Sequence, residues 1–142
     1  MARILIVEDE ELVRRLMKAM LEQLSHEVYI LKTTDEALEF LEKTSLTRVR
    51  SSYSTPNCCT EDIPDYQGQY DVDLIISDWK FKNGKIDGVR FLETVRLRYP
   101  GIKRVLMTAS FIDDLPDIGC PILGKPFEID DLRITIDELM AA

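Results

Sequence analysis

The chain has 142 residues, a length that suits one domain, and it is 45% hydrophobic and 31% charged, as globular proteins usually are. Its formal net charge of −8 argues against direct nucleic-acid binding, and no stretch approaches the ~18 apolar residues of a membrane span or resembles a signal peptide. We therefore expect a single domain over residues 1–142 that acts on neither a nucleic acid nor a membrane.

Short apolar segments alternate along the chain with amphipathic ones. The apolar segments predict strands at 3–7, 28–31, 72–77, 105–107 and 122–123. The amphipathic segments predict helices over Glu10–Leu24, about 87–98 and Phe127–Leu139. A further helix is expected to open at a Thr33-x-x-Glu36 capping box, with Ala37, Leu38 and Leu41 facing inward. This alternation predicts an α/β domain with a parallel sheet and right-handed crossovers.

Two stretches interrupt the alternation. Residues 44–70 are rich in Ser, Thr, Pro, Asn and Tyr and have no clear periodicity, so we expect a long, solvated insertion with partial order. Only residues 111–119 separate the fourth and fifth strands, which leaves room for one or two helical turns. A helix at this place, the fourth along the chain, would therefore be shortened.

The cysteines indicate a reducing environment. Cys58, Cys59 and Cys120 are odd in number and lack the spacing of metal ligands. The adjacent pair suits an exposed loop with reduced thiols better than a disulfide or a zinc site. A cytoplasmic location fits this pattern best.

Charged side chains follow three of the predicted strands. Glu8-Asp9 follows the first strand, Asp78 follows the third, and Lys125 follows the fifth. Ligands of α/β folds bind at the carboxyl ends of the strands, and carboxylates gathered there without a partner would repel one another and resist ionisation. A divalent cation and one lysine would remove this repulsion. The pattern therefore predicts a metal-assisted site with a nucleophilic aspartate.

In chain order, Glu8-Asp9, Asp78, Thr108-Ala109 and Lys125-Pro126 resemble the motifs of receiver domains of two-component response regulators, over essentially the whole chain. The resemblance implies a flavodoxin-like, doubly wound five-stranded sheet of order 2-1-3-4-5. It also implies a phosphoacceptor in a phosphorelay, with Mg²⁺ or alternatively Mn²⁺ as cofactor. The implied phosphodonor is a sensor histidine kinase or a histidine phosphotransfer protein. An unidentified output protein would receive the signal through protein–protein contacts. Self-phosphorylation and slow autodephosphorylation would be the only chemistry.

The resemblance assigns roles to individual residues. The implied phosphoacceptor is Asp78. The metal would be held by Glu8, Asp9, Asp78 and the main-chain carbonyl of Lys80. Thr108 and Lys125 would stabilise the phosphoryl group, and Lys80 and Ser110 would be modulators of this site. Magnesium prefers near-octahedral oxygen ligands, so Asp9 would ligate directly and Glu8 either directly or through water. The family usually holds the peptide bond matching Lys125–Pro126 in the cis form.

Each role has a structural alternative. Asp78 could cap a turn, since Asn83-Gly84 follows nearby. Asp9 or Glu10 could cap the first helix, and Thr108 considered alone would usually be a helix cap. The position of Asp78 after an apolar strand favours the nucleophile, while metal binding and capping by Asp9 are compatible.

The chain departs from the family pattern at three places. The loop from Asn83 to Gly88 is about two residues longer than usual and lacks the usual proline. Lys80 puts a positive charge two residues after Asp78, where we hypothesise that it contacts the phosphoryl group and changes its lifetime. Ile122 occupies the switch position that is normally aromatic, so signalling either uses another element, such as 44–70 or 111–119, or is weak.

Two other functions remain open. A pseudo-receiver that binds partners without switching is supported by the missing aromatic residue and the shortened helix. An aspartate-nucleophile phosphatase of the haloacid dehalogenase type would carry a second Asp two residues after the first, where this chain has Lys80. Trp79 is expected on the side of the sheet opposite Asp78, about half covered, and His26 is expected in a surface loop.

Overall fold

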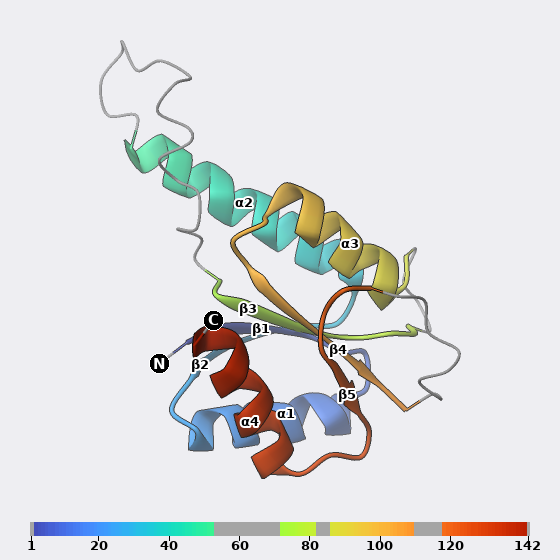
Figure 1. Cartoon of the computed structure of the whole chain (residues 1–142). Helices are drawn as coiled ribbons and strands as arrows, with labels where there is room; N and C mark the ends of the chain where they lie inside the picture. The colour runs from blue at the N-terminus through green and yellow to red at the C-terminus, as the bar shows by residue number, and fades with distance from the viewer. Residues whose placement is uncertain (1, 53–71, 82–85, 110–117, 142) are drawn as a thin grey trace.

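The computed structural model describes residues 2–52, 72–81, 86–109 and 118–141, and Figure 1 draws the rest as a grey trace. The predictions about residues 53–70, 82–85, Ser110 and 111–117 lie outside the described residues. Cys58 and Cys59 also fall there. Among the described residues, no helix is both long enough and apolar enough to span a membrane.

The core of the protein is a five-stranded sheet. Its strands are β1 (Arg3–Val7), β2 (Glu27–Leu31), β3 (Leu74–Asp78), β4 (Lys103–Thr108) and β5 (Ile122–Gly124). All neighbouring strands are parallel, and their order is β2-β1-β3-β4-β5. The predicted flavodoxin-like topology is confirmed.

Helices cover both faces of the sheet. They are α1 (Glu11–Gln23), α2 (Thr34–Ser52), α3 (Gly88–Arg98) and α4 (Ile129–Ala141). In Figure 1, α2 and α3 lie on one face and α1 and α4 on the other. This three-layer arrangement follows from parallel strands, because each crossover must place its connection over one face or the other.

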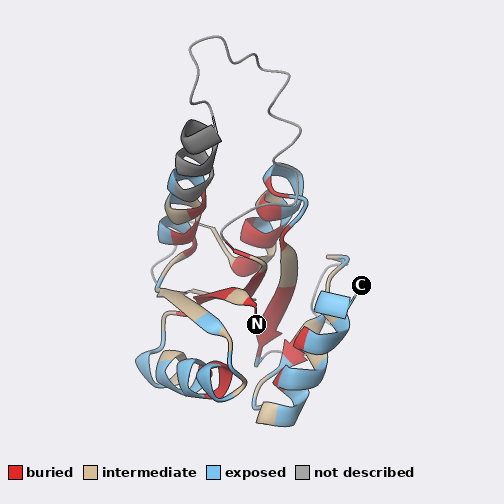
Figure 2. Ribbon diagram, turned by 90° about the vertical axis from the view of Figure 1, so that its left-hand side faces the viewer, coloured by how far each residue is buried: buried red, intermediate tan, exposed pale blue. Residues whose placement is uncertain are grey.

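Alternation along the buried strands produces two hydrophobic cores. Ile4 and Ile6 pack with the inward residues of α1 and α4, whereas Leu5 and Val7 pack with those of α2 and α3. Figure 2 shows buried residues in the sheet and on the helix sides that face it, with exposed residues outward. The strands therefore read as continuous apolar runs because both of their faces are covered.

The capping box predicted for the second helix is present. The Thr33 hydroxyl accepts the Glu36 N–H at 3.1 Å, and the Glu36 carboxylate accepts the Thr33 N–H at 3.2 Å. Each of these bonds satisfies a backbone donor that the first helical turn leaves unpaired.

The structure corrects several predicted boundaries, and two of these corrections have a clear cause in the sequence. Helix α2 continues to Ser52, so the irregular segment does not begin at residue 44. Residues 44–52 contain neither Gly nor Pro, and extending an existing helix requires less ordering per hydrogen bond than starting one. Strand β4 begins at Lys103 instead of Val105, because its first two residues are charged and conceal the strand pattern.

Candidate functional site

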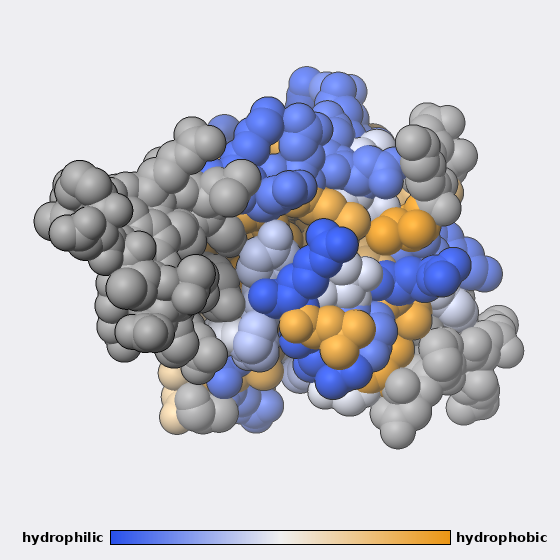
Figure 3. All heavy atoms as spheres, turned by 90° about the horizontal axis from the view of Figure 1, so that it is seen from above, coloured by the Kyte–Doolittle hydropathy of each residue, from blue (hydrophilic) through white to orange (hydrophobic). Residues whose placement is uncertain are grey.

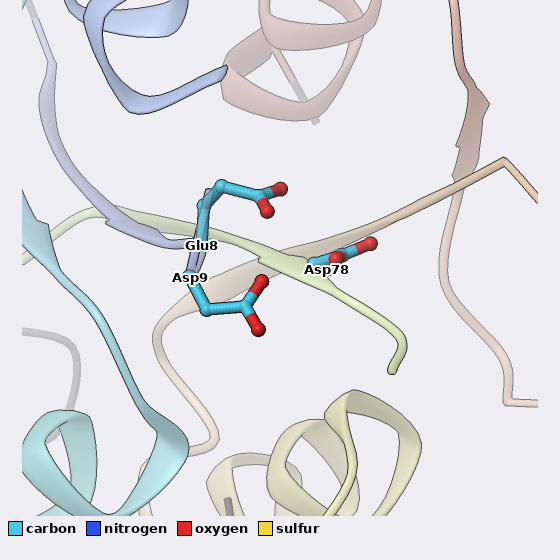
Figure 4. Close-up of side chains that lie close together, drawn as sticks. All are labelled: Glu8, Asp9 and Asp78. Carbon is cyan, nitrogen blue, oxygen red and sulfur yellow. The ribbon is translucent and has the colours of Figure 1, made fainter. Parts of the chain in front are cut away.

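Three carboxylates meet where two adjacent strands end. Glu8 and Asp9 directly follow β1, and Asp78 is the last residue of β3. These strands pair from Ile4 and Leu74 onward, so their carboxyl ends lie side by side. One carboxylate oxygen from each residue lies within 4.8 Å of the others, and Figure 4 shows Glu8 and Asp9 beside Asp78. The predicted acidic cluster is present.

Lys125 joins the cluster from the other side. Its Nζ lies 2.7 Å from Glu8 Oε2 and 3.2 Å from Asp78 Oδ1. Its backbone N–H donates to the Thr108 carbonyl at 2.7 Å, which ties the loop after β5 to the end of β4. The Lys125–Pro126 peptide bond is cis, as the resemblance implies.

Burial dominates the electrostatics of the site. Glu8 is fully buried and Asp78 retains only 14% side-chain exposure. Burial raises the pKa of both carboxyls. Repulsion from Asp78 adds to the rise at Glu8, repulsion from Asp9 adds to the rise at Asp78, and Lys125 opposes the rise at both. Burial alone would lower the pKa of Lys125, but its hydrogen bond to Glu8 and the nearby carboxylates raise it overall. The site therefore favours an added positive charge.

The two oxygens of Asp78 differ in their environment. Oδ1 accepts the Trp79 N–H at 3.0 Å and pairs with Lys125. Oδ2 has no hydrogen-bond partner among the described residues. One oxygen is therefore held in place while the other is left to form a new bond.

Gly88, which ends the loop that begins at Asn83, lies directly against the site, a contact that the sequence did not predict. Gly88 begins α3, and its N–H donates to the Trp79 carbonyl at 2.6 Å. A Cβ at this position would overlap with the carbonyl oxygen of Asp78. The available signal was a glycine in a helical first turn, where most other residues would stabilise the helix better.

The carboxylates fit a magnesium ion. Magnesium takes oxygen ligands at about 2.1 Å, and one oxygen from each of these carboxylates lies within 4.8 Å of the others, so only small movements would be needed to share an ion. Both oxygens of Glu8 already accept hydrogen bonds, from Lys125 and from the Glu10 N–H. Glu8 therefore suits a water-mediated contact with the ion better than direct ligation.

The remaining predicted residues lie as follows. Thr108 is buried at the end of β4, next to the site, and Ile122 is half-buried at the start of β5. The Lys80 ammonium lies 4.7 Å from the centroid of the Trp79 ring and forms no ion pair in the described part of the chain. A main-chain role for Lys80 stays a prediction, as does modulation by Ser110.

Trp79 and His26 depart in part from expectation. Trp79 packs in the core under α2 and α3, on the predicted side of the sheet, but it is buried with only 9% exposure. His26 is half-buried, and its Nδ1 accepts the Ala2 N–H at 3.0 Å. This bond joins the turn after α1 to the start of β1.

An apolar groove borders the acidic cluster. It has a volume of about 250 Å³ and lies between α1 and the loop that follows β5. Its walls are formed by Val13, Leu16, Met17, Ala109, Lys125, Pro126 and Phe127. Leu16 is 56% exposed although it is apolar.

The opposite face of the molecule, which bears α2 and α3, is mixed in character, with hydrophilic side chains and scattered apolar ones (Figure 3).

Comparison with known proteins places this fold. No protein-family profile matches the chain, and no curated protein matches it in sequence. Among solved structures, a signal receiver domain of an HD domain-containing protein from Pseudomonas fluorescens matches with a TM-score of 0.73 and 18% identity, over 99% of this chain and 87% of that one. A response regulator receiver domain protein from Clostridium thermocellum gives 0.71 and 22%, over 99% and 95% of the two chains.

A third structure was solved with ligands. The response regulator TrrA from Thermotoga maritima, in complex with Mg²⁺ and BeF, matches with a TM-score of 0.68 and 24% identity, over 98% and 99% of the two chains. The chain therefore has the fold of response regulator receiver domains, and the resemblance seen in the sequence is confirmed at the level of the fold.

Proposed function

We propose that the protein is a receiver that accepts a phosphoryl group on Asp78 from a histidine kinase or a histidine phosphotransfer protein. The observation that carries this proposal is the cluster of Glu8, Asp9 and Asp78 around Lys125, at the carboxyl ends of β1, β3 and β5. The receiver fold, which belongs to signalling modules, supports it. The proposed domain is the whole chain.

The chemistry follows from the two environments of Asp78. Oδ2 attacks the phosphorus atom of the donor in line with the bond to the leaving group. The phosphorus–nitrogen bond of the phosphohistidine breaks, and its electron pair stays on the imidazole, which takes up a proton. Lys125 lies 3.2 Å from Asp78 Oδ1, within reach of the transferred group, and neutralises part of its charge. Thr108 is assigned a hydrogen bond to the same group.

A magnesium ion at Asp9 and Asp78 would lower the repulsion between the carboxylates and the incoming phosphoryl oxygens. The raised pKa of Asp78 supports this requirement, because a carboxyl that resists ionisation is a poor nucleophile without a neighbouring cation. Mn²⁺ has the same preference for oxygen ligands and is expected to substitute.

The donor protein must bring its histidine to Asp78, so its docking surface has to adjoin the acidic cluster. The apolar groove meets this condition, since Lys125 belongs both to its wall and to the cluster. We assign the groove to the phosphodonor. Its apolar residues Leu16 and Phe127 would supply buried contact area.

The test is phosphorylation by a small phosphodonor such as acetyl phosphate with Mg²⁺, read by intact mass. The wild-type chain should gain one phosphoryl group. The gain should disappear in Asp78→Asn and after chelation of the metal, and it should persist in Asp73→Asn, which changes an aspartate outside the cluster. A wild-type mass that never changes would reject the receiver function.

A non-switching pseudo-receiver is the second candidate, favoured by Ile122 at the switch position. Amide NMR spectra recorded before and after phosphorylation separate the two functions, because a pseudo-receiver would either stay unmodified or show chemical-shift changes confined to the acidic cluster.

A phosphatase would instead turn over phosphomonoesters repeatedly. The proposed modulation by Lys80 predicts a different decay of the phosphorylated form in Lys80→Ala.

A further inference from the structure

A basic pocket lies at the amino-terminal end of β4, away from the acidic cluster. Arg96, Lys103 and Arg104 line a cavity of about 210 Å³ whose other walls include Ile102, Cys120 and Leu139. Lys103 begins β4 and Thr108 ends it, so about 16 Å of strand separates this pocket from the phosphoryl site. The cavity therefore takes no part in the chemistry at Asp78.

The pocket lies where β5 is too short to cover β4. Strand β5 pairs with β4 only from Leu106 to Thr108. The Lys103 N–H points to β3 and donates to Asp73, whereas the Leu106 N–H points to β5 and donates to Pro121. Because backbone direction alternates along a strand, the N–H of Arg104 faces the uncovered side. No strand residue among those described pairs with Arg104 there, so a backbone donor faces the pocket.

The charges around the pocket are not balanced. Arg96 pairs with the carboxylate of Glu93, which is also near enough to Arg104 for both guanidinium groups to lower its pKa. Lys103 and Arg104 form no ion pair in the described part of the chain, although both are half-buried. Three basic residues thus line one cavity in a protein whose net charge is −8. Partly buried cations attract anions more strongly than cations in open water.

We propose that this pocket is a binding site for an oxyanion, a carboxylate or a phosphate, held by Arg104 and Lys103. The oxyanion is carried either by a small molecule or by an acidic peptide segment. A water molecule in the liquid occupies about 30 Å³, so the cavity has room for such a group and a short apolar stem. Ile102 and Leu139 would contact the stem, and the Arg104 guanidinium matches a planar or tetrahedral oxyanion.

The test is an amide NMR titration at constant ionic strength, without Mg²⁺, in two arms: inorganic phosphate and a short glutamate-rich peptide. Shifts are expected at residues 102–105 and at Cys120. Arg104→Gln and Lys103→Gln should each weaken binding by at least about tenfold, since a hydrogen bond to a charged group contributes that much. Arg15→Gln is the matched control, because it removes one exposed cation from α1.

Each arm identifies a source of the anion. Shifts with phosphate alone point to a small molecule, shifts with the peptide alone point to an acidic protein segment, and shifts with both point to any accessible oxyanion. No shift at these amides in either arm would overturn the proposal. An equal loss of binding in Arg15→Gln would overturn it too, since the effect would then be one of net charge.

A second measurement needs no variant. Cys120 lines the pocket, and burial raises the pKa of its thiol, so it should react slowly with N-ethylmaleimide. A bound oxyanion should slow this reaction several-fold at Cys120 and leave Cys58 and Cys59 unchanged, as read by peptide mass. An unchanged rate at Cys120 at saturating ligand would contradict the proposal. Neither result depends on whether Asp78 is phosphorylated.

Discussion

At the scale of single residues, the site depends on one lysine that serves two carboxylates. Lys125 is closer to the fully buried Glu8 than to Asp78, and Glu8 has both of its oxygens engaged. A buried, ionised carboxylate without a cation and hydrogen-bond donors would be strongly unfavourable. The ion pair between Glu8 and Lys125 therefore both stabilises the charge of Glu8 and orients Lys125. Phosphorylation of Asp78 would put new negative charge beside the same ammonium and draw it from Glu8.

Gly88 sets the path of the backbone at Asp78, the proposed phosphoacceptor. Replacement by Ala would place a methyl group onto the Asp78 carbonyl, and relieving that overlap must shift either α3 or the end of β3. We expect Gly88→Ala to lower the free energy of unfolding by about 1–3 kcal/mol and to slow phosphorylation. Urea denaturation and intact mass measure the two effects.

Gly124 provides the matched control for this substitution. Apart from its two chain neighbours, no heavy atom of the described residues lies within 4 Å of a Cβ added there, although Gly124 immediately precedes Lys125. Gly124→Ala should therefore change stability by less than about 0.5 kcal/mol. Equal destabilisation by the two substitutions would show that the contact with Asp78 is not the cause.

His26 should make the stability of the protein depend on pH. Burial lowers its pKa below the ordinary 6.5, and the charged amino terminus adds to this, while Asp137 opposes it. The unfolded chain then binds the proton more tightly than the folded one. The contribution of neutral His26 to the free energy of unfolding is complete above pH 6.5, and it is lost as the pH falls through the lower pKa that His26 has in the folded state.

The variant His26→Asn isolates this effect, because it keeps an acceptor for the Ala2 N–H but does not titrate. Between pH 7 and pH 5, the wild type should lose stability relative to the variant by less than about 1 kcal/mol, since water screens the partly exposed ring. Urea midpoints at several pH values provide the measurement. Parallel curves for the two proteins would mean that His26 does not titrate differently on folding.

At the scale of secondary-structure elements, α1 connects the fold with the proposed partner. Its inward residues Met17 and Leu21 are buried in the core, while Leu12 and Leu16 remain 78% and 56% exposed. Leu16 lines the groove beside Lys125. An exposed apolar residue beside the proposed phosphorylation site is consistent with a surface that another protein covers.

Leu16→Glu should slow phosphotransfer from a histidine phosphotransfer protein that acts on the wild-type chain, by about tenfold or more, because a charge would be buried at the interface. Phosphorylation by acetyl phosphate should not change, since Leu16 does not touch the carboxylates. Leu97→Glu is the control, because Leu97 is 68% exposed on α3. Equal losses in both variants would exclude the groove as the docking surface.

At the scale of the whole molecule, the sheet holds the acidic cluster together against its own repulsion. The cluster joins β1, β3 and the loop after β5, so a cation bound there links segments far apart in the sequence. A ligand that binds only the folded state stabilises it. The apo protein is therefore expected to be less stable than its metal complex.

Mg²⁺ at about 100 times its dissociation constant should raise the free energy of unfolding by about 2.7 kcal/mol. Asp9→Asn should abolish most of this gain because it removes a carboxylate that we propose ligates the ion directly. Glu10→Gln should keep the gain, since Glu10 lies outside the cluster. Urea unfolding with and without Mg²⁺ measures it, and a full gain in Asp9→Asn would contradict metal binding at this cluster.

The sequence by itself determined the order of strands and helices along the chain, the capping box of α2 and the residues of the acidic cluster. These features are local, because buried parallel strands appear as apolar runs and because strand ends gather at one edge of the sheet. The extension of α2 to Ser52 and the start of β4 at Lys103 were not predicted, because polar residues there weaken the periodicity on which the prediction relies.

Only the tertiary structure decided which partners the charged groups take. It paired Lys125 with Glu8 at 2.7 Å and placed Lys80 over Trp79. It brought Gly88 against Asp78 and left the amino-terminal end of β4 open beside Arg104. These contacts depend on distances between segments that the chain separates, and local patterns of polarity carry no information about such distances.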